Sequence, residues 1–424
     1  MSVAIAKNAD QSTAESADDR NSAVPSQQRL AGKRVGMVVF SPFPADPRPR
    51  RAMEALRYEG AHIELICEAD GNLPKREKLE NLEVIRIPIR HIRGGALSYA
   101  YQYSSFILIS AAIFAWRTLR GRYDLIYVHN MPDILVLSGM IPKLFGAKVI
   151  LDQHDPMPEL MRTIFNKDEQ SFAVRVIRRL EKWSIARASL VITVNEACRR
   201  IFSTRSCSSD KVGVVMNSPD EKMFPYRSAH SYAVRQTGLP FVMMYHGSLV
   251  ARNGLELAVD ALHRLLQDVP EAELRVFGRS TDYLEQVMLK ARTLGISDKV
   301  HFLGPRRLED LAGEIERCDV GVVPNQLNTF TEINTPTRIF EYLALGKPVI
   351  APSTSGVRDY FGPESLVFFE AGNAGDLAAQ MLYVASNPEE AVDLAENGQR
   401  IYKAHTWQLE RETLVSLVAN LLNN

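Results

Sequence analysis

The chain has few of the features that mark a secreted or membrane-spanning protein. It holds only four cysteines in 424 residues (Cys67, Cys198, Cys207 and Cys318), and their spacing matches neither a disulfide framework nor a metal site. No apolar run reaches the roughly 18 residues of a transmembrane helix. The first residues lack the apolar core of a signal peptide. We therefore expect reduced thiols and a cytoplasmic protein.

The chain also lacks any net charge, but its charges are unevenly distributed. Residues 1–225 hold 32 basic and 25 acidic side chains, a net charge of +7, and the remainder carries −7. A basic half favours contact with something anionic, such as a membrane surface, a polyphosphate or a nucleic acid. An incidental imbalance is the alternative interpretation.

Apolar segments alternate between strand-like and helix-like patterns in both halves of the chain. This rhythm is typical of doubly wound parallel α/β sheets, and 424 residues are enough for two domains. Strands are predicted at 34–40, 61–67, 82–89, 125–129, 148–152, 190–194, 212–216, 241–245, 274–277, 300–302, 320–323, 349–350 and 365–369. Helices are predicted at 50–60, 98–120, 134–144, 255–269, 282–294, 308–317, 374–386 and 407–422.

Composition places the domain boundaries. Residues 1–32 have few large apolar side chains and are expected to be a disordered tail. The segment Ser218–Pro240 is rich in proline and weakly periodic, which predicts a linker over 221–240 between domains at 33–220 and 241–404. A helix over 405–424 follows. Two such domains facing each other form a cleft between the carboxyl ends of their strands.

The segment Thr335–Pro352 is the most informative in the sequence. Thr-Pro-Thr predicts a threonine N-cap with proline in the first turn of a helix, and Gly346 with Pro348 predicts the end of that helix. Glu341 lies one turn into this helix, where it can accept hydrogen bonds from sugar hydroxyls while a phosphate binds the free N–H groups of the first turn. Arg338 is one turn earlier and is expected to face the same ligand, although a surface cation is the alternative.

A glycine-containing loop, His246–Gly254, follows a predicted strand and precedes a helix. Gly247 and Gly254 permit close backbone approach to a ligand, and Arg252 can bind a phosphate bidentately. An ordinary strand–helix turn is the alternative interpretation.

In the first half, polar residues follow two strand ends. His154 and Asp155 come just past one predicted strand, with Glu159 a turn later, and His129 ends the preceding strand. His154 is a candidate for orienting a reacting sugar, and the acids for accepting substrate hydroxyls; a capping aspartate beside a structural histidine is the alternative. The segment Ser41–Arg48 ends the first strand without the glycines of a dinucleotide fingerprint, which argues against an NAD-binding domain.

The stretch Phe106–Trp116 is apolar on all sides and is flanked by arginines. It is too short to span a bilayer, but aromatic residues beside arginines suit a helix lying on an anionic membrane surface. A second basic cluster around Trp183 could extend that face. A fully buried core helix is an equally good interpretation.

Taken together, these segments resemble glycosyltransferase family 4, whose members have the GT-B fold. The similarity covers about residues 34–420 and rests on the order of many segments, including DPRPRRAMEAL, YDLIYVHNMPD, ILDQHDPMPE, LVITVNEA, YHGSLVARNGLELAVDAL, LRVFGRS and TPTRIFEYLALGKPVIAP. The resemblance implies two Rossmann-like domains facing an interdomain cleft, the first on the acceptor side and the second binding a nucleotide sugar, with the last helix crossing back to the first domain.

The resemblance also implies roles for individual residues. Donor-binding candidates are Gly247, Ser248, Arg252, Asn253, Gly278, Asn334, Thr335, Arg338 and Glu341. Acceptor-side candidates are Asp46, Arg48, His129, Asp155 and Glu159. Catalytic candidates are His154, Glu332 and Arg252. No metal and no cofactor are expected, since the nucleotide sugar is itself a substrate.

The chain departs from the family pattern in two places. The expected second glutamate falls on Ile333, with Glu332 one position away, so either the loop presents Glu332 or backbone groups and Asn334 hold the sugar. The usual phosphate-binding Arg and Lys of the glycine loop fall on Ser248 and Asn253, where Arg252 is the candidate substitute.

The implied activity is retaining transfer of a hexose from a UDP- or GDP-linked sugar to a saccharide or lipid-linked saccharide, in cell-surface or exopolysaccharide synthesis. We expect peripheral contact with the inner face of an anionic cell membrane through Ser98–Arg122. We expect no nucleic-acid partner. The alternatives are a non-catalytic binding protein that kept the fold and a nucleotide-sugar epimerase.

Overall fold

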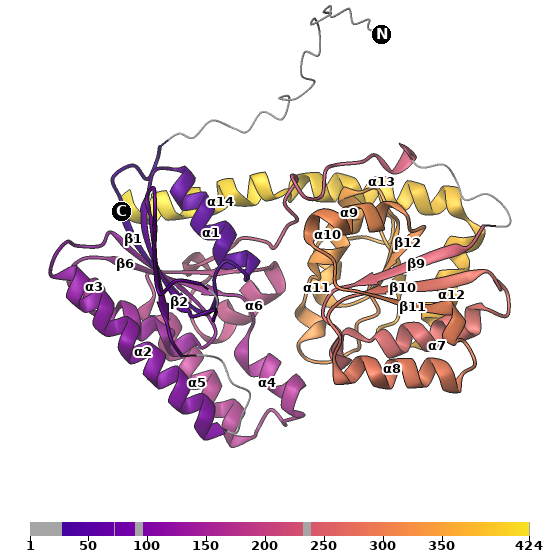
Figure 1. Ribbon diagram of the computed structural model, residues 1–424, viewed down its shortest axis with the longest axis horizontal. Helices are drawn as coiled ribbons and strands as arrows, with labels where there is room; N and C mark the ends of the chain where they lie inside the picture. Colours follow the sequence, from indigo (N-terminus) through magenta and orange to yellow (C-terminus); the bar gives the residue numbers. More distant parts are fainter. Residues whose placement is uncertain (1–27, 72, 90–95, 232–238, 424) are drawn as a thin grey trace, which may run out of the picture.

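The computed structural model describes residues 28–71, 73–89, 96–231 and 239–423, so most of the expected tail and part of the expected linker lie outside the described residues. Two α/β lobes stand side by side, one built from each half of the chain (Figure 1). Each lobe contains one sheet, of eight strands in the first and six in the second. The predicted fold class, two parallel-rich α/β sheets, is confirmed.

The first sheet is parallel except at one edge. Its order is β3-β4-β2-β1-β5-β6-β7-β8, and β3 runs antiparallel to β4. The central strands are buried on both faces, which explains their nearly continuous Val, Ile and Leu runs. The strands are β1 Arg34–Pro42, β2 His62–Glu68, β3 Arg76–Leu79, β4 Leu82–Ile87, β5 Leu125–His129, β6 Lys148–Gln153, β7 Leu190–Thr193 and β8 Val212–Val214.

Helices cover both faces of this sheet. They are α1 Pro47–Tyr58, α2 Ala96–Thr118, α3 Met140–Leu144, α4 Met157–Phe165, α5 Phe172–Arg187 and α6 Glu196–Arg205. The single helix predicted over 134–144 is wrong in detail, because a 3-10 segment, η1 Asp133–Gly139, precedes a short α3. Side-chain caps begin three of the helices: Asp46 caps α1, Ser171 caps α5 and Asn195 caps α6.

The second sheet is parallel throughout its described strands, in the order β11-β10-β9-β12-β13-β14. The strands are β9 Phe241–His246, β10 Ala272–Phe277, β11 Val300–Gly304, β12 Val320–Val322, β13 Val349–Pro352 and β14 Val367–Phe369. The helices of this lobe are α7 Leu255–Leu265, α8 Asp282–Thr293, α9 Leu308–Glu316, α10 Thr337–Ala344, α11 Ser355–Arg358, α12 Ala374–Ser386 and α13 Pro388–Ala404.

The last helix, α14 Trp407–Asn423, leaves the second lobe and packs on the first (Figure 1). Its apolar face, with Leu414, Val415 and Val418, joins the core that β1 and α1 form. The buried Glu410 accepts a hydrogen bond from the backbone N–H of Met216 at 2.7 Å. Because Met216 lies just beyond β8, this bond ties the crossing helix to the point where the chain leaves the first sheet.

Helix α2 is half core and half surface, so its interpretation as a fully buried core helix is wrong, and contact of its exposed face with a membrane stays a prediction. Phe106 and Phe114 are 1% and 0% exposed and belong to the first lobe's core. Leu108, Trp116 and Leu119, the last just after the helix, are 70%, 53% and 74% exposed. In the described residues, no helix is long and apolar enough to cross a membrane.

The two faces of α2 are expected to respond differently to truncation. Replacing Phe114 with alanine removes a fully buried ring and should lower the free energy of unfolding by about 3–5 kcal/mol. Replacing Trp116 with alanine should lower it by less than about 1 kcal/mol, because that ring is half exposed. Urea unfolding of the two variants measures both values. Equal losses of unfolding free energy in the two variants would contradict the assignment of Phe114 to the core and Trp116 to the surface.

Candidate active site

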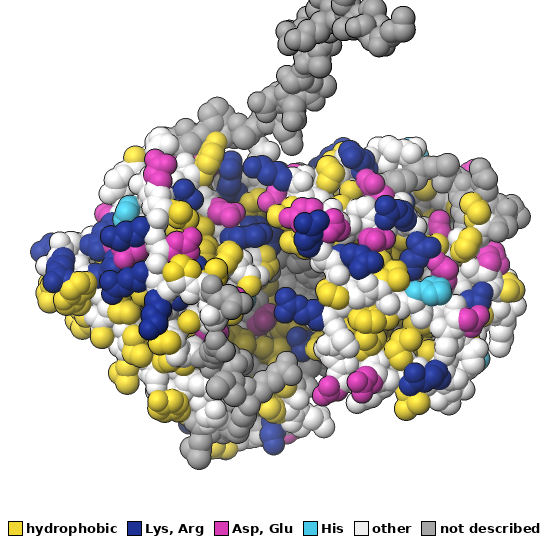
Figure 2. Space-filling view, viewed as in Figure 1, with side chains coloured by type: hydrophobic (Ala, Val, Ile, Leu, Met, Phe, Trp, Pro, Cys, Tyr) yellow, Lys and Arg dark blue, Asp and Glu magenta, His cyan; other side chains and the backbone are white. Residues whose placement is uncertain are grey.

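A cleft of about 1200 Å³ opens between the two lobes, and residues from both line it. Figure 2 shows the molecule hollowed at this junction. The first lobe contributes the loop after β1 and the segment after β6, and the second contributes the segments that follow β9, β10 and β11 and the start of α10. The site therefore lies beyond the carboxyl ends of two parallel sheets, where open α/β folds bind ligands.

Arginine dominates the charge of this cleft. Five arginines line it against two acids, and the lining contains no lysine. The cationic residues are Arg50, Arg252, Arg279, Arg306 and Arg338, and the acids are Asp155 and Glu341. A concave surface with this charge attracts an anionic ligand, and guanidinium groups suit bidentate contacts with phosphate.

Arg279 and Arg306 were not predicted from the sequence. Each follows a strand of the second sheet, Arg279 after β10 and Arg306 after β11, so the rule that ligands bind past strand ends would have found them. They supply positive charge that the glycine loop itself lacks at Ser248 and Asn253.

The glycine loop reaches the cleft as expected. Gly247, Ser248, Arg252 and Asn253 all line it, and so does Gly278, which ends the neighbouring strand. The loop turns into α7 at Gly254, whose φ of 72° and whose position against the carbonyl of Pro324, 1.8 Å from an added Cβ, admit only glycine. The glycine therefore lets this turn pack directly against the segment that follows β12.

Helix α10 presents Arg338 and Glu341 to the cleft. The helix begins at Thr337 with Pro336 at the N-cap and no side-chain cap, so the expected threonine cap is wrong. The Thr335 hydroxyl instead donates to the carbonyl of Gly356 at 2.7 Å. Arg338 lies against Gly247 and over the Tyr245 ring, 4.8 Å from its centroid, and its Nη1 is buried with no hydrogen-bond partner among the described residues.

Glu341 and His246 face each other at the base of the cleft, 3.3 Å apart between Oε2 and Nε2. Burial raises the pKa of Glu341 to about 7, against the opposing effect of Arg338 and Arg51. Burial, with Arg338 nearby, lowers the pKa of His246 to about 3. His246 is therefore neutral at physiological pH, so the pair is not an ion pair. His246 was not predicted as a site residue.

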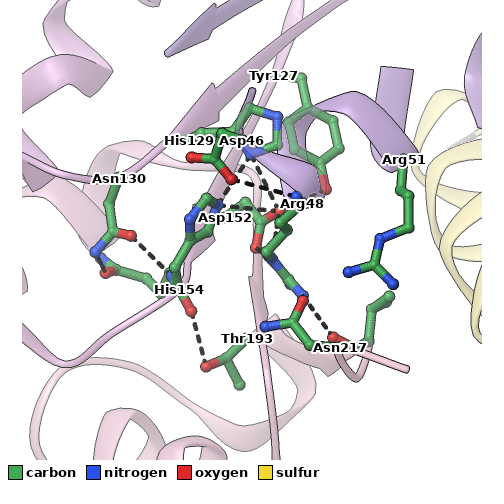
Figure 3. A network of polar contacts seen from close by, with 12 residues as sticks. Asp46, Arg48, Arg51, Tyr127, His129, Asn130, Asp152, His154, Thr193 and Asn217 are labelled. Carbon is green, nitrogen blue, oxygen red and sulfur yellow. Dashed lines mark hydrogen bonds and ion pairs between the residues drawn. The ribbon is translucent and has the colours of Figure 1, made fainter. Parts of the chain in front are cut away.

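On the first lobe, Asp152 at the end of β6 is the centre of a buried polar network (Figure 3). Arg48 contacts its carboxylate with Nη2 at 2.7 Å and Nε at 3.1 Å, and the Tyr127 hydroxyl donates to it at 3.1 Å. Burial alone would raise the pKa of Asp152, but Arg48 and the histidines His129 and His154 hold it well below its usual range.

From this network His154 reaches the cleft, as does Asn217, which accepts a hydrogen bond from Arg48 at 3.0 Å. Nε2 of His154 lies 3.1 Å from Nδ1 of His129, and the His154 backbone N–H donates to the Asn130 side chain at 2.8 Å. Burial lowers the pKa of His154 to about 3 despite the nearby Asp152. The cleft therefore receives a neutral imidazole in a fixed orientation, which suits hydrogen bonding to a hydroxyl or an oxyanion.

The acceptor-side candidates divide into those in the cleft and those in the core. Asp155 lines the cleft, and burial raises its pKa to about 6. Arg48 and His129 are buried in the network around Asp152, so neither is free to bind an acceptor. Asp46 caps α1 by accepting from the Arg48 N–H.

Glu159 does not line the cleft either. It is buried and paired with Arg205, with Arg205 Nη1 at 2.6 Å, and the same guanidinium also binds Glu181. A buried carboxylate in such a pair stabilises the fold, because removing its partner would leave an uncompensated charge.

The segment before α10 does not present Glu332 to the cleft, so the first alternative is wrong, and Asn334 remains the candidate. The Glu332 carboxylate accepts from the Ser355 N–H at 3.0 Å, at the start of α11, and Glu332 is absent from the lining of the cleft. Ile333, where the family pattern has a glutamate, packs against the core of the first lobe. Asn334 and Thr335 line the cleft instead.

Among the described residues, one group could hold a metal ion by its geometry: His129, Asp152 and His154, whose ligand atoms lie within 4.8 Å of one another. The guanidinium of Arg48 already compensates the charge of Asp152, as a divalent ion otherwise would. These three residues therefore suit a hydrogen-bond network better than a metal site.

Two family models match the chain in the order of the lobes. The model "Glycosyl transferase 4-like domain" matches residues 45–218, and "Glycosyl transferases group 1" matches residues 234–401.

Curated relatives carry glycosyltransferase names. The D-inositol 3-phosphate glycosyltransferase of Corynebacterium jeikeium is 25% identical over 55% of this chain and 57% of that protein. The putative glycosyltransferase YtcC of Bacillus subtilis is 25% identical over 68% of this chain and 65% of that protein. The chain thus aligns with somewhat less than two thirds of each.

Solved structures show the same fold. Sucrose-phosphate synthase from Thermosynechococcus elongatus superposes with a TM-score of 0.74 at 19% identity, covering 92% of this chain and 99% of that one. Anabaena Alr3699/HepE, in complex with UDP and glucose, superposes with a TM-score of 0.67 at 17% identity over 92% of this chain and 100% of that one. These likenesses establish the GT-B arrangement of two Rossmann-like domains.

Proposed function

The chain is a glycosyltransferase of the family 4 type with the GT-B fold, and from this premise we propose that it transfers a hexose from a UDP- or GDP-linked sugar with retention of configuration. The acceptor we propose is a saccharide or lipid-linked saccharide in cell-surface or exopolysaccharide synthesis. One observation carries the donor assignment: Arg338, at the cleft and beside the glycine loop, has a buried Nη1 with no partner in the described part of the chain.

The geometry supports a specific binding mode. A diphosphate fits beside the glycine loop, where Arg338 and Arg252 meet its charge, and Glu341 is placed to accept from ribose hydroxyls. UDP is the favoured nucleotide, because Anabaena Alr3699/HepE was solved with UDP and with UDP-glucose. The first-lobe residues His154 and Asp155 lie across the cleft, on the side where the sugar and acceptor would meet.

Catalysis in this scheme is mainly electrostatic. As the bond from the anomeric carbon to the diphosphate breaks, negative charge grows on the leaving oxygen, and preorganised guanidinium groups stabilise it. The cleft's arginines supply this charge, so we propose a reaction without an obligatory metal ion. His154, held neutral and oriented by His129, hydrogen-bonds the donor sugar. Since Glu332 is bound to the start of α11, the sugar is held by Asn334 and Thr335.

The activity is tested with a panel of UDP- and GDP-hexoses and lipid-linked saccharides, with nucleoside diphosphate release as the readout. Phosphorylated polyols belong in the panel, because several relatives are named for inositol 3-phosphate. Acceptor-dependent release supports the proposal. No binding or release with any donor would favour a non-catalytic protein, and a free epimer formed without acceptor would favour an epimerase.

Glu341 gives the donor site a predicted pH dependence. Hydroxyl donors bind the ionised carboxylate, and with a pKa of about 7 that form is a minority at pH 6. Affinity for UDP-glucose should therefore fall about tenfold from pH 8 to pH 6. A nucleotide sugar is the right probe because its diphosphate does not titrate in this range. Calorimetric titration measures the change.

The matched variant is Glu341→Gln, which keeps the shape but removes the ionisable group. It should bind more weakly than wild type at pH 8 and show a flat profile between pH 6 and pH 8. A wild-type profile that is also flat would argue against contact between Glu341 and the donor.

We further propose that the first lobe docks on an anionic membrane through an outer helical face formed by α2, α3 and α5. Helices α2 and α3 pack together, and Lys143 of α3 donates to the Arg187 carbonyl at the end of α5. The exposed apolar side chains of this outer helical face are Tyr101, Leu108, Trp116, Leu119, Ile141, Leu144, Phe145, Phe172 and Leu180.

Basic side chains accompany these apolar ones. Arg120 stacks on Trp116 at 3.3 Å from the ring centroid, and Arg187 stacks on Trp183 at the same distance. Arg175, Arg179 and Lys182 are exposed along α5. Aromatic and cationic side chains on one face match the boundary between anionic headgroups and acyl chains.

The membrane proposal predicts a selective loss of binding. Replacing Trp116 and Leu119 with serine removes two exposed apolar groups and should weaken binding to phosphatidylglycerol-containing vesicles at least about tenfold, since each buried side chain of this size contributes about 1.5–3 kcal/mol. Co-sedimentation measures the binding.

Leu289→Ser in the second lobe is the matched control, because Leu289 is 57% exposed on α8, outside the outer helical face. It should bind as wild type does. Full binding by the Trp116/Leu119 variant, or equal binding to neutral phosphatidylcholine vesicles, would contradict the proposal.

A further inference from the structure

The two lobes touch directly at the start of α6. Asn195, which caps this helix, donates from Nδ2 to the carbonyl of Ile333 at 2.9 Å and to the Thr335 hydroxyl at 3.1 Å. One residue later, the Glu196 N–H contacts the Tyr360 hydroxyl at 2.9 Å. A residue of the first lobe thus binds the segment of the second lobe that runs into α10.

The Asn195 side chain performs two separate tasks. Its Oδ1 accepts from the Cys198 N–H at 2.8 Å, which caps α6. Since an N–H can only donate and the Ile333 carbonyl can only accept, these two partners fix the amide orientation. Asp or Ser would cap the helix as well as Asn. An ionised Asp has no donor, and Ser has a single O–H on a shorter side chain, so only the amide supplies two N–H donors for Ile333 and Thr335. At 1% exposure of Asn195, water does not replace them.

The segment that Asn195 holds is the one that faces the donor sugar in the proposed function. Residues 332–335 point in three directions: Glu332 to the start of α11, Ile333 to the core of the first lobe, and Asn334 and Thr335 to the cleft. The segment is anchored on one side by its own lobe and on the other by Asn195. Its position in the cleft therefore depends on contact between the lobes.

We propose that Asn195 is a positioning residue for the donor sugar: it links contact between the lobes to the placement of Asn334 and Thr335. This inference rests on the proposed function. It explains how the chain manages with Ile333 where the family pattern has a glutamate. The segment is held in place by apolar contact and by an amide from the opposite lobe, and the sugar is bound by the two residues that follow.

Asn195→Asp is the sharpest test, because it keeps the cap while replacing the two N–H donors with a negatively charged acceptor. The new carboxylate would face the Ile333 carbonyl and the Thr335 hydroxyl, so two hydrogen bonds are lost and one acceptor is left unpaired. We expect kcat/KM for UDP-glucose to fall about 10- to 100-fold. The affinity for UDP should change less than about threefold, because the nucleotide is held by Glu341 and the glycine loop. If the wild-type protein prefers a GDP-linked sugar, GDP-mannose and GDP are used in place of UDP-glucose and UDP.

Two further variants control the experiment. Arg200→Ala removes the Arg200–Asp359 pair at the same interface, but Arg200 is 54% exposed, so its loss should cost less than about fivefold. Asn195→Ser caps the helix without adding a charge and should also lower kcat/KM. If the Asn195→Asp variant does not fold, the kcat/KM of the Asn195→Ser variant tests the role of Asn195 instead.

The outcomes separate the inference from its premise. Wild-type kcat/KM in the folded aspartate or serine variant, or an equal loss of UDP and UDP-glucose affinity, overturns the role of Asn195 and leaves the proposed function standing. A wild-type protein that neither binds nor turns over any nucleotide sugar overturns the proposed function, and this inference with it.

Discussion

An excess of arginine over acidic residues at the junction of the two lobes is the feature on which the function of this structure depends. Elsewhere the buried arginines are compensated: Arg48 by Asp152, and Arg205 by Glu159 and Glu181. In the cleft five arginines face two acids, and one buried nitrogen of Arg338 has no partner among the described residues. Burying a charged group without a partner costs free energy unless a bound ligand supplies the missing hydrogen bond.

The lobes must be held in register for such a site to work, since each sheet supplies only half of it. Helix α14 crosses back to the first lobe, with Glu410 bound to the chain just beyond β8. Asn195 joins the lobes again at the start of α6, next to Val194, which lines the cleft. Between these two points, the cleft residues lie on loops at strand ends, which is where a parallel sheet leaves room for variation in substrate.

Much of this could be predicted from the sequence. Strand and helix periodicity predicts both sheets, and glycine and proline spacing predicts the loop at Gly254 and the end of α10. The direction of each polar side chain could not be predicted. Arg48, His129 and Glu159 follow the family's motifs, yet they are in the core, because nearby charges from distant segments pair with them.

The departure at Ile333 shows the same limit. One residue of offset between Glu332 and the expected position looks like a small shift of a loop. The structure instead commits Glu332 to the start of α11 and Ile333 to the opposite lobe. The first contact joins residues 23 positions apart, and the second joins residues from the two halves of the chain, so no local pattern records them. Helix α2 shows the same limit of sequence-based prediction, because the residues of its apolar sequence lie partly in the core and partly on an exposed face.

A crystal structure of the protein with UDP-glucose tests the central claim most directly. The account predicts a diphosphate beside Gly247 and Arg338, ribose hydroxyls on Glu341, and the glucose between Asn334 and His154. A nucleotide bound away from Arg338 and Glu341, or held by the first lobe alone, would contradict it.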